Sequence, residues 1–415
     1  MWVAIFMAIL TFVVPRKYFL LPYVLAACFV PADQRIIIMD LDFTVLRILI
    51  VFGVLRILVR NEQVAIRWNR FDKMVLAWAF CGAVVYVLQW SDMKALINRS
   101  GFLFDIIGLY WLSRQRIRSW SDIKLFVAFL AFSALILAPL VALEWSTGQN
   151  PFEVLGRVHT AVREGRYRCQ ASFPHSIMLG LFWATLVPLF VGLGISYKKK
   201  ILYWVTATVS VFIVCATASS TPLFTLIAVA ILLVLFRYRC YGRQIVWALC
   251  GLTIALHLVM KAPVWHLISR VNIVGGSTGW HRYHLIDQAA EHFGEWVLIG
   301  TRSTTHWGWN LGDITNQYVL EGVRGGLGTL VLFIALLVWA VKIVGGYSLC
   351  CVQVKQQWLA WAICVSILGH CISFIGVSYF GQIEMLLYFM FALVALIYEL
   401  SFKPVPTVRP AKLLA

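Results

Sequence analysis

Apolar runs follow one another along almost the whole chain, and no other feature restricts the possible folds as strongly. A membrane-spanning helix needs about 20 mostly apolar residues, and the chain is 61% hydrophobic and 13% charged. In soluble domains about a quarter of all residues are charged. The low charge and the repeated apolar runs therefore predict an all-α polytopic membrane protein. The runs lie at 2–14, 18–30, 43–59, 72–90, 101–113, 121–143, 176–195, 201–217, 221–236, 244–259, 317–341, 358–378 and 382–400.

We expect these runs to form one membrane domain over residues 1–415 with about twelve transmembrane helices. The runs 2–14 and 18–30 are each too short to cross a bilayer well. They would form a tight hairpin around the segment Pro15-Arg16-Lys17.

Basic residues collect in short connections between the apolar runs, as they do in cytoplasmic loops. Counted from residue 121 onward, these connections fall on one side with the tail 401–415, which we place in the cytoplasm. The segments 144–175 and 260–316 then lie in the periplasm, and the predicted location is a bacterial inner membrane. The basic connections hold Arg60, Arg67, Arg70, Lys73, Arg114, Arg116, Arg118, Lys124, Lys198, Lys199, Lys200, Arg237, Arg239 and Arg243, and the tail holds Lys403, Arg409 and Lys412.

The charge and the cysteines exclude other classes of protein. The net charge is +17, from 35 Lys and Arg against 18 Asp and Glu, but its place in short loops argues against nucleic acid as a partner. The ten cysteines form no Cys-x-x-Cys pair and no zinc or disulfide pattern. Asp40-Leu41-Asp42 could hold a divalent metal, although pairing of either Asp with Arg47 fits the sequence better.

The two segments predicted to lie in the periplasm, 144–175 and 260–316, also carry basic residues, contrary to the preference of such residues for cytoplasmic loops. The first carries several arginines against only Glu153 and Glu164, and an anionic ligand at this face would explain them. Alternatively, long translocated loops tolerate basic residues. The basic residues are Arg157, Arg163, Arg166 and Arg168 in the first segment, and Lys261, Arg270, Arg282 and Arg302 in the second.

Arg166 and Arg168 directly precede the helix that opens at His175. A helix N-terminus attracts anions, and arginine binds phosphate with a planar fork. An arginine beside this helix start could therefore hold a phosphate at the membrane surface. The alternative is that the arginines reach lipid headgroups.

A second candidate is the segment Gly279-Trp280-His281-Arg282-Tyr283-His284, which leads into a short helix of the large outer loop. Arg282 would sit in its first turn, with the aromatic residues as neighbours, and is a candidate functional residue. Trp280 and Tyr283 could stack on sugar rings, although such residues are also ordinary interface anchors. The histidines are more consistent with simple polar contacts.

The third candidate runs from Gly312 to Gly328. Asp313 is either a helix N-cap or a general base that deprotonates a sugar hydroxyl. Asn316 could orient the acceptor sugar. Glu321 is a catalytic candidate and Arg324 a glycan-binding one, because ionisable groups at membrane depth are often functional, but the two could simply pair with each other. The glycines would let helices pack closely.

These features resemble the O-antigen ligase and O-antigen polymerase-like family of membrane glycosyltransferases over roughly residues 30 to 400. An arginine precedes a Phe-x-x-Pro-type helix start, here Arg168 before Ser172-Phe173-Pro174-His175. A second, Arg282, opens the outer helix that is followed by Gly300. A polar turn, Thr315-Asn316-Gln317-Tyr318, leads into the glycine-rich span at Gly325-Gly326.

The resemblance implies a GT-C-like helical fold and a glycan donor carried on polyprenyl diphosphate. It implies no cofactor and no metal, with Arg168 and Arg282 on the leaving diphosphate. On this interpretation Arg166 would also contact the diphosphate and His175 the glycan. The ligase branch carries a histidine just before the asparagine position, where this chain has Thr315, and this favours a polymerase. Asp313 is then the candidate base.

Three functions remain open at this point. The first is a polymerase of O-antigen or exopolysaccharide, which transfers a glycan to another lipid-linked repeat unit. The second is an O-antigen ligase that uses a lipid A core or another acceptor. The third is a flippase or transporter of lipid-linked oligosaccharide. Besides the bilayer and this substrate, expected partners are a chain-length regulator and a flippase protein.

Overall fold

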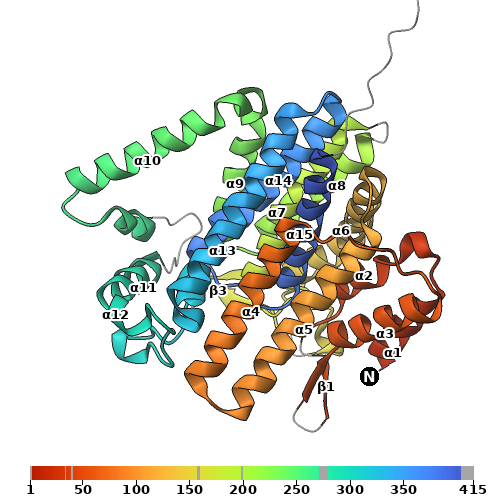
Figure 1. The fold of residues 1–415 in the computed structure, drawn as a ribbon, viewed down its shortest axis with the longest axis horizontal. Coiled ribbons are helices and arrows are strands. Elements are labelled where there is room, and N and C mark those ends of the chain that lie inside the picture. The colour runs from red at the N-terminus through yellow and green to blue at the C-terminus, as the bar shows by residue number, and fades with distance from the viewer. Residues whose placement is uncertain are drawn as a thin grey trace, which may run out of the picture.

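The structure is a computed structural model in which residues 2–32, 34–38, 41–156, 159–197, 200–270 and 279–402 are described. Arg157, Asp40, Lys198, Lys199 and the tail beyond Phe402 lie outside the described residues. Figure 1 shows a bundle of long helices with smaller elements at its lower end. The α-helices are α1 (Trp2–Val13), α2 (Leu21–Phe29), α3 (Val45–Val59), α4 (Arg70–Trp90), α5 (Met93–Arg116), α6 (Trp120–Thr147), α7 (Ser176–Ser196), α8 (Lys200–Ala216), α9 (Ser220–Val234), α10 (Gly242–Val259), α11 (Gly279–Glu291), α12 (Phe293–Trp296), α13 (Gln317–Cys350), α14 (Val354–Gly376) and α15 (Gln382–Ser401).

Short elements connect the helices. Two antiparallel hairpins, β1 (Arg35–Ile38) with β2 (Leu41–Thr44) and β3 (Ala161–Arg163) with β4 (Arg166–Arg168), lie between helices. The 3-10 helices are η1 (Arg16–Tyr18), η2 (Glu153–Leu155), η3 (Leu235–Tyr241), η4 (Val264–Arg270) and η5 (Thr305–Trp307).

Helices α7 and α15 form the centre of the bundle, because both are apolar around their whole circumference and such helices bury all faces. Buried side chains run along nearly the full length of each. Helix α7 packs against α8, α9 and α14, and α15 packs against α5 and α13. Trp183 of α7 is the largest fully buried side chain among the described residues.

Seven described helices are long and apolar enough to cross a membrane, so the chain has the character of a multi-pass membrane protein. The expectation of about twelve spans is not met. Helices α1, α2 and α3 have 12, 9 and 15 residues, and the runs 221–236 and 244–259 lie in one stretch, Ser220–Val259. Counting apolar runs overestimated the spans because several runs are too short.

The two long connections predicted from the sequence join helices at the same end of the bundle. Helix α6 ends at Thr147 and α7 begins at Ser176, while α10 ends at Val259 and α13 begins at Gln317. Helices α11 and α12 lie at the lower left in Figure 1, and β3 lies near the middle of the picture, behind α4 and α13. The connection containing η3, with Arg237, Arg239 and Arg243, lies at the upper end.

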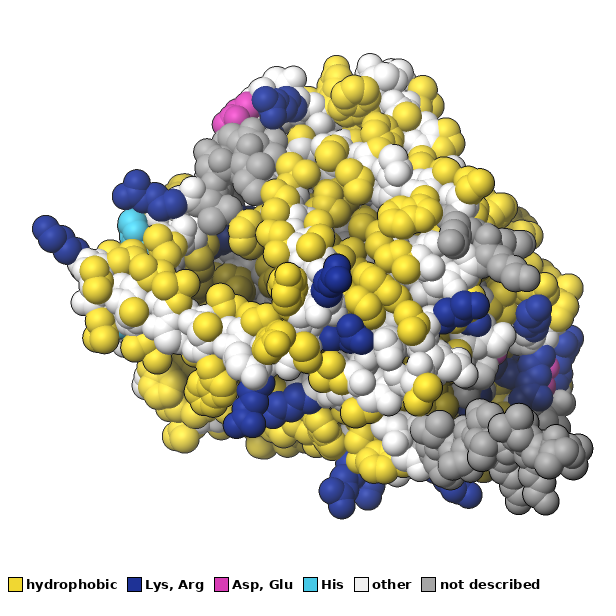
Figure 2. All heavy atoms as spheres, turned by 90° about the horizontal axis from the view of Figure 1, so that it is seen from above, with side chains coloured by type: hydrophobic (Ala, Val, Ile, Leu, Met, Phe, Trp, Pro, Cys, Tyr) yellow, Lys and Arg dark blue, Asp and Glu magenta, His cyan; other side chains and the backbone are white. Residues whose placement is uncertain are grey.

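Helix α10 projects sideways from the bundle in Figure 1. Along α10, which the structure describes in full, no side chain is buried. Seen from above in Figure 2, hydrophobic side chains cover the projecting part, and the surface is hollowed between it and the bundle. An apolar helix that the protein does not cover is suited to contact with lipid.

Two buried arginines are held by carboxylates away from the outer loops. Arg114 donates from Nε to Asp72 Oδ1 over 2.9 Å and also binds Glu399. Arg56 contacts Glu62 over 3.3 Å. Buried charges are normally paired in this way, which makes buried arginines without a carboxylate informative.

Candidate functional site

Glu144 at the end of α6 shapes the loop that carries Arg168. Its carboxylate accepts hydrogen bonds from the backbone N–H groups of Gln170 and Ala171, each over 2.9 Å, and from Thr160 over 2.8 Å. Ala171 has a φ of 49°, a conformation that costs energy for a residue with a side chain. The buried carboxylate offsets this cost and fixes the backbone that follows Arg168.

Arg168, the last residue of β4, reaches the start of α9. One Nη donates to Ser219 Oγ over 2.9 Å, and Ser219 is the residue just before the helix. The side chain is 9% exposed, and its Nε has no hydrogen-bond partner among the described residues. A buried cation with an unused donor suits a bound anion.

Arg282 on α11 approaches the same region from the long connection 260–316. Its Nε donates to the carbonyl of Gly376 over 2.7 Å. A Cβ on Gly376 would lie 3.2 Å from Thr221 Cγ2 and 3.5 Å from Arg282 Nε, so Arg282 also lies beside the first turn of α9. We call Arg168, Arg282 and the N-terminus of α9 the arginine site.

The arginine site carries an excess of positive charge. Among the described residues, neither Arg168 nor Arg282 has a carboxylate partner, unlike Arg56 and Arg114. Burial, and to a smaller extent the charge of Arg163, lowers the pKa of Arg168 and lowers that of Arg282 to about 10. Both groups stay charged at neutral pH, and the positive end of the α9 helix dipole adds to the potential.

His175 lies at the edge of this site as the N-cap of α7. Its Nδ1 accepts a hydrogen bond from the backbone of Ile177 over 3.0 Å. Burial, followed by the charge of Arg168, lowers the pKa of His175 to about 4. The imidazole is therefore neutral at physiological pH and adds no charge of its own.

The other predicted phosphate and sugar contacts are more scattered. Arg166, Trp145 and Tyr167 line a separate cavity of about 580 Å³. Arg168 does not line this cavity. Trp280 is exposed and stacks on His284 with centroids 4.8 Å apart. Tyr283 packs against His266 at 4.8 Å. These aromatic rings build the outer layer around α11.

A second site lies on the other side of the loop between α14 and α15. A cavity of about 460 Å³ opens between the loop 301–314 and the ends of α4, α13 and α15. It adjoins a smaller cavity among α4, α5, α13 and α15. The two share Leu320, Arg324, Tyr379 and Glu384, and we call them together the mixed cavity.

The mixed cavity contains both predicted and unexpected residues. Asp313 and Arg324, which the sequence singled out, line it. So do Arg99 and Glu384, which sequence reasoning missed. Glu384 lies inside the apolar run 382–400, and an ionisable residue in such a run is a signal that could have revealed it. Arg99 precedes a run and gave no comparable signal.

The start of α13 holds the loop that separates the two sites. Asn316 Oδ1 caps the helix by accepting from Val319 N over 3.1 Å, while its Nδ2 donates to the Ile375 carbonyl over 2.9 Å. Gln317 Oε1 accepts from Tyr379 N over 2.8 Å. Asn316, not Asp313, is therefore the N-cap, and its amide positions the loop beside Arg282.

Glu321 does not form the expected pair with Arg324. Its carboxylate accepts from Trp78 Nε1 over 3.1 Å and from Gln317 Nε2 over 2.8 Å. Among the described residues no ion pair joins it to Arg324, which remains free to face the mixed cavity. The interaction with Gln317 instead links Glu321 to the loop at Tyr379.

The glycines of α13 leave room for the loop 297–301 as well as for neighbouring helices. The helix breaks at Gly326, which has a φ of 68°. Into this break, Val297 O accepts from Leu327 N and Val323 O accepts from Thr301 N, each over 2.9 Å. A Cβ on Gly326 would lie 2.2 Å from the Leu298 carbonyl. The loop 297–301 is thereby fixed against α13, and its last residue, Thr301, lines the mixed cavity.

The remaining metal candidate is not supported by the side chains that can be described. Asp42 Oδ2 pairs with Arg35 Nη1 over 2.9 Å, whereas Arg47 pairs with Asp105 over 2.9 Å. Arg47 also donates to the backbone carbonyl of Asp42, so the two residues are in contact without the expected ion pair, and Asp40 lies outside the described residues. Within the described ranges, no three His, Cys, Asp or Glu side chains gather as metal ligands.

Comparison of the sequence with protein-family models and with curated proteins found no match. The functional argument therefore depends on the arginine site and the mixed cavity themselves.

Proposed function

We propose that the protein is a polysaccharide polymerase of the bacterial inner membrane with a GT-C-like architecture. It would transfer a glycan from polyprenyl diphosphate to another lipid-linked repeat unit at the periplasmic face, with the C-terminus in the cytoplasm. The observation that carries this proposal is the arginine site. Arg168 and Arg282 come from different outer loops and converge, without a carboxylate, on the start of α9.

The arginine site suits a diphosphate because each part contributes to binding a compact dianion. Arginine offers a planar fork of donors to phosphate oxygens, and the positive end of the α9 helix dipole also favours an anion. In glycosyl transfer the electron pair of the sugar–oxygen bond moves to the diphosphate. Fixed positive groups that stabilise this leaving group lower the barrier.

The acceptor hydroxyl must lose its proton as the new glycosidic bond forms. Asp313 is exposed at the rim of the mixed cavity, and its charge reaches His175 beside the arginine site. This location between the two sites supports Asp313 as the general base. Asn316 and Glu321 act in this proposal as positioning residues, because their polar groups are engaged by the protein.

The test is the length of the glycan made in cells that lack the chromosomal gene and carry a plasmid copy. Wild type and Arg67→Ala, a change at an exposed arginine of a different loop, should restore a ladder of lengths. Arg168→Ala and Arg282→Ala should leave single repeat units. Normal lengths that stay lipid-linked in the deletion strain would instead identify a ligase.

A second candidate function is transport of lipid-linked oligosaccharide. The observation that favours it is the set of ionisable residues in the mixed cavity, since buried charges in membrane proteins often mark transport pathways. Accumulation of single units on the cytoplasmic side of the deletion strain would support this function and contradict polymerisation.

A further inference from the structure

We propose that the mixed cavity is the binding site for the acceptor saccharide and that Arg99 and Glu384 recognise its hydroxyl groups. This inference builds on the proposed polymerase function and adds a second substrate site to it. It concerns a neutral, hydroxyl-rich ligand, whereas the arginine site concerns the diphosphate.

Arg99 is a buried polar group directed to this cavity without a carboxylate. It is 7% exposed, lines the inner part of the cavity, and its Nε lacks a hydrogen-bond partner among the described residues. Its guanidinium lies 3.8 Å from the ring centroid of Tyr86, which holds the group in one orientation. The remaining N–H groups can donate to a ligand.

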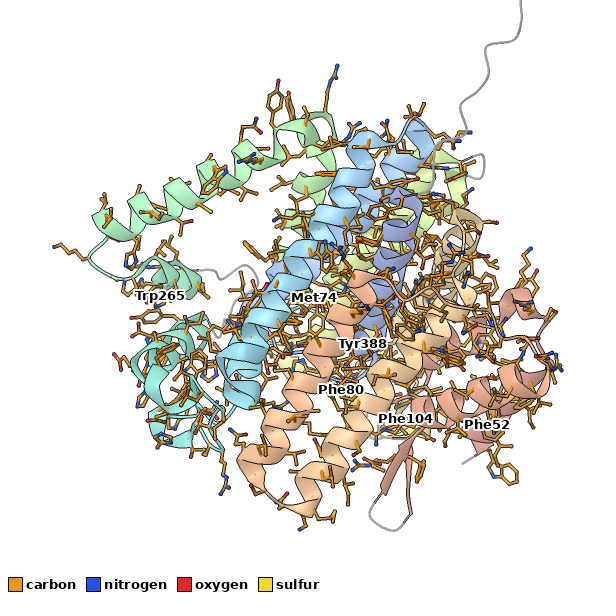
Figure 3. The ribbon with its side chains drawn as sticks, in the orientation of Figure 1. Phe52, Met74, Phe80, Phe104, Trp265 and Tyr388 are labelled. Atoms are coloured by element: carbon orange, nitrogen blue, oxygen red, sulfur yellow. The ribbon has the colours of Figure 1, made fainter. Side chains whose placement is uncertain are left out.

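Glu384 supplies acceptors in the same space. It lines both parts of the cavity, and in the described part of the chain no hydrogen bond or ion pair engages its carboxylate. The charges of Arg324 and Arg99 reach it. Tyr388, one turn further along α15, lies in the interior of the bundle in Figure 3. Glu384 is half-buried, so its carboxylate oxygens stay accessible from the cavity to a ligand that donates hydrogen bonds.

The start of α15 keeps Glu384 in place. Gln382 Nε2 donates to the carbonyls of Val30 and Ser172 over 3.1 and 2.9 Å. Gly381 has a φ of 73° and packs against Pro174. The segment that follows Arg168 therefore also orients Glu384, so the two sites are built on a common support.

The composition of the wall fits a sugar better than an ion. The outer part presents hydroxyl groups from Thr301, Ser303, Thr305 and Ser378 and aromatic rings from Trp90 and Tyr379. Its volume of about 460 Å³ falls in the range of about 300–1,000 Å³ usual for small-molecule sites. Hydroxyl groups and aromatic faces match the polar edges and apolar CH faces of a sugar ring.

The charges of the cavity also favour a neutral ligand. Arg302 is anchored by donating from Nε to the Gln89 carbonyl over 2.8 Å. Basic and acidic side chains are equally represented in the wall, so neither sign of ligand charge is selected. The basic residues are Arg99, Arg302 and Arg324, and the acidic ones are Asp313, Glu321 and Glu384.

The experiment measures binding of two probes to the full-length protein in detergent by microscale thermophoresis. One probe is the free oligosaccharide that mild acid releases from lipid-linked repeat units of the deletion strain. This probe carries no diphosphate. The other is undecaprenyl diphosphate, which lacks the sugar. Each variant is first checked by size-exclusion chromatography.

Glu384→Gln and Arg99→Gln should weaken oligosaccharide binding by about 10- to 100-fold, the loss expected for a hydrogen bond to a charged group. They should leave undecaprenyl diphosphate binding within a factor of two. Ser303→Trp, a change at the exposed rim, should block the oligosaccharide in a protein whose interior is unaltered. Lys94→Gln and Glu291→Gln, at exposed positions, serve as matched controls.

Arg168→Ala should show the opposite pattern, with loss of undecaprenyl diphosphate and normal oligosaccharide binding. If wild type does not bind the oligosaccharide, or if Ser303→Trp, Arg99→Gln and Glu384→Gln bind it normally, the cavity proposal is overturned while diphosphate binding can still stand. If only undecaprenyl diphosphate fails to bind wild type, the polymerase proposal fails and the saccharide site remains.

Discussion

The arginine site and the mixed cavity share the loop between α14 and α15, yet their charges differ. In the arginine site, Arg168 and Arg282 have no acidic partner among the described residues, and the start of α9 adds positive potential. The mixed cavity combines basic and acidic groups with hydroxyls and aromatic rings. The difference teaches that adjacent sites on one scaffold can carry different balances of charge, and in our proposal this balance separates the diphosphate from the saccharide.

Placing a carboxylate beside Arg168 should remove the excess positive charge that distinguishes the arginine site from the mixed cavity. In Ser219→Asp the new side chain would lie where Ser219 Oγ now accepts from Arg168. It would pair with the arginine and repel a diphosphate, while an acidic residue at a helix start leaves folding intact. We expect the rate of polymerisation to fall roughly 100-fold or more, measured with lipid-linked repeat units in proteoliposomes. Unchanged polymerisation would show that the charge excess is not used.

Removing the break in α13 tests whether the wall of the mixed cavity depends on it. Gly326→Ala places a Cβ against the Leu298 carbonyl at a φ of 68°, so the loop 297–301 must move. We expect a loss of about 1–3 kcal/mol in stability and weaker oligosaccharide binding, measured by thermal unfolding and by the binding assay. Gly328→Ala is the matched control, since open space surrounds that position. Equal melting temperatures for the two variants would contradict this role.

Loosening the support of Arg168 should affect one site and spare the other. Glu144→Gln keeps the shape of the side chain but replaces one acceptor oxygen with an amide group that faces a backbone N–H of Gln170 or Ala171. A lost hydrogen bond to a charged group costs about 1.5–3 kcal/mol. Because this hydrogen bond holds the backbone after Arg168, we expect part of that free energy to be lost from binding, so that undecaprenyl diphosphate binds roughly 10-fold more weakly. Oligosaccharide binding should not change. A parallel loss in both assays would indicate general unfolding.

The smallest expected effect concerns pH. The pKa of His175 is lowered to about 4, against 6.5 for an unperturbed histidine. Between these values the unfolded chain binds a proton that the folded protein does not, so stability falls as pH drops from about 6.5 to about 4. We expect the melting temperature to decrease over this interval, and to decrease less in His175→Gln. An identical pH profile in this variant would show that other groups cause the loss.

Local chemistry in the sequence was enough to predict several features. Hydropathy predicted a multi-pass helical protein, since transfer of a long apolar run into lipid is favourable wherever the run lies in the fold. Arg168 and Arg282 stood out because basic residues in outer loops are unusual. The count of twelve spans was wrong, because short apolar runs do not all cross the bilayer.

Only the tertiary structure decided which of these residues meet and which are left without partners. Arg99 on α5 and Glu384 on α15 are far apart in the sequence, and their shared cavity exists because the helices pack around α13. Likewise, Arg166 and Arg168 look equivalent in the chain, yet they line different spaces. Hydropathy and charge are properties of single segments, whereas burial and pairing depend on contacts between segments. The sequence therefore determined the membrane class and the unusual outer charges, and the packing determined the two sites.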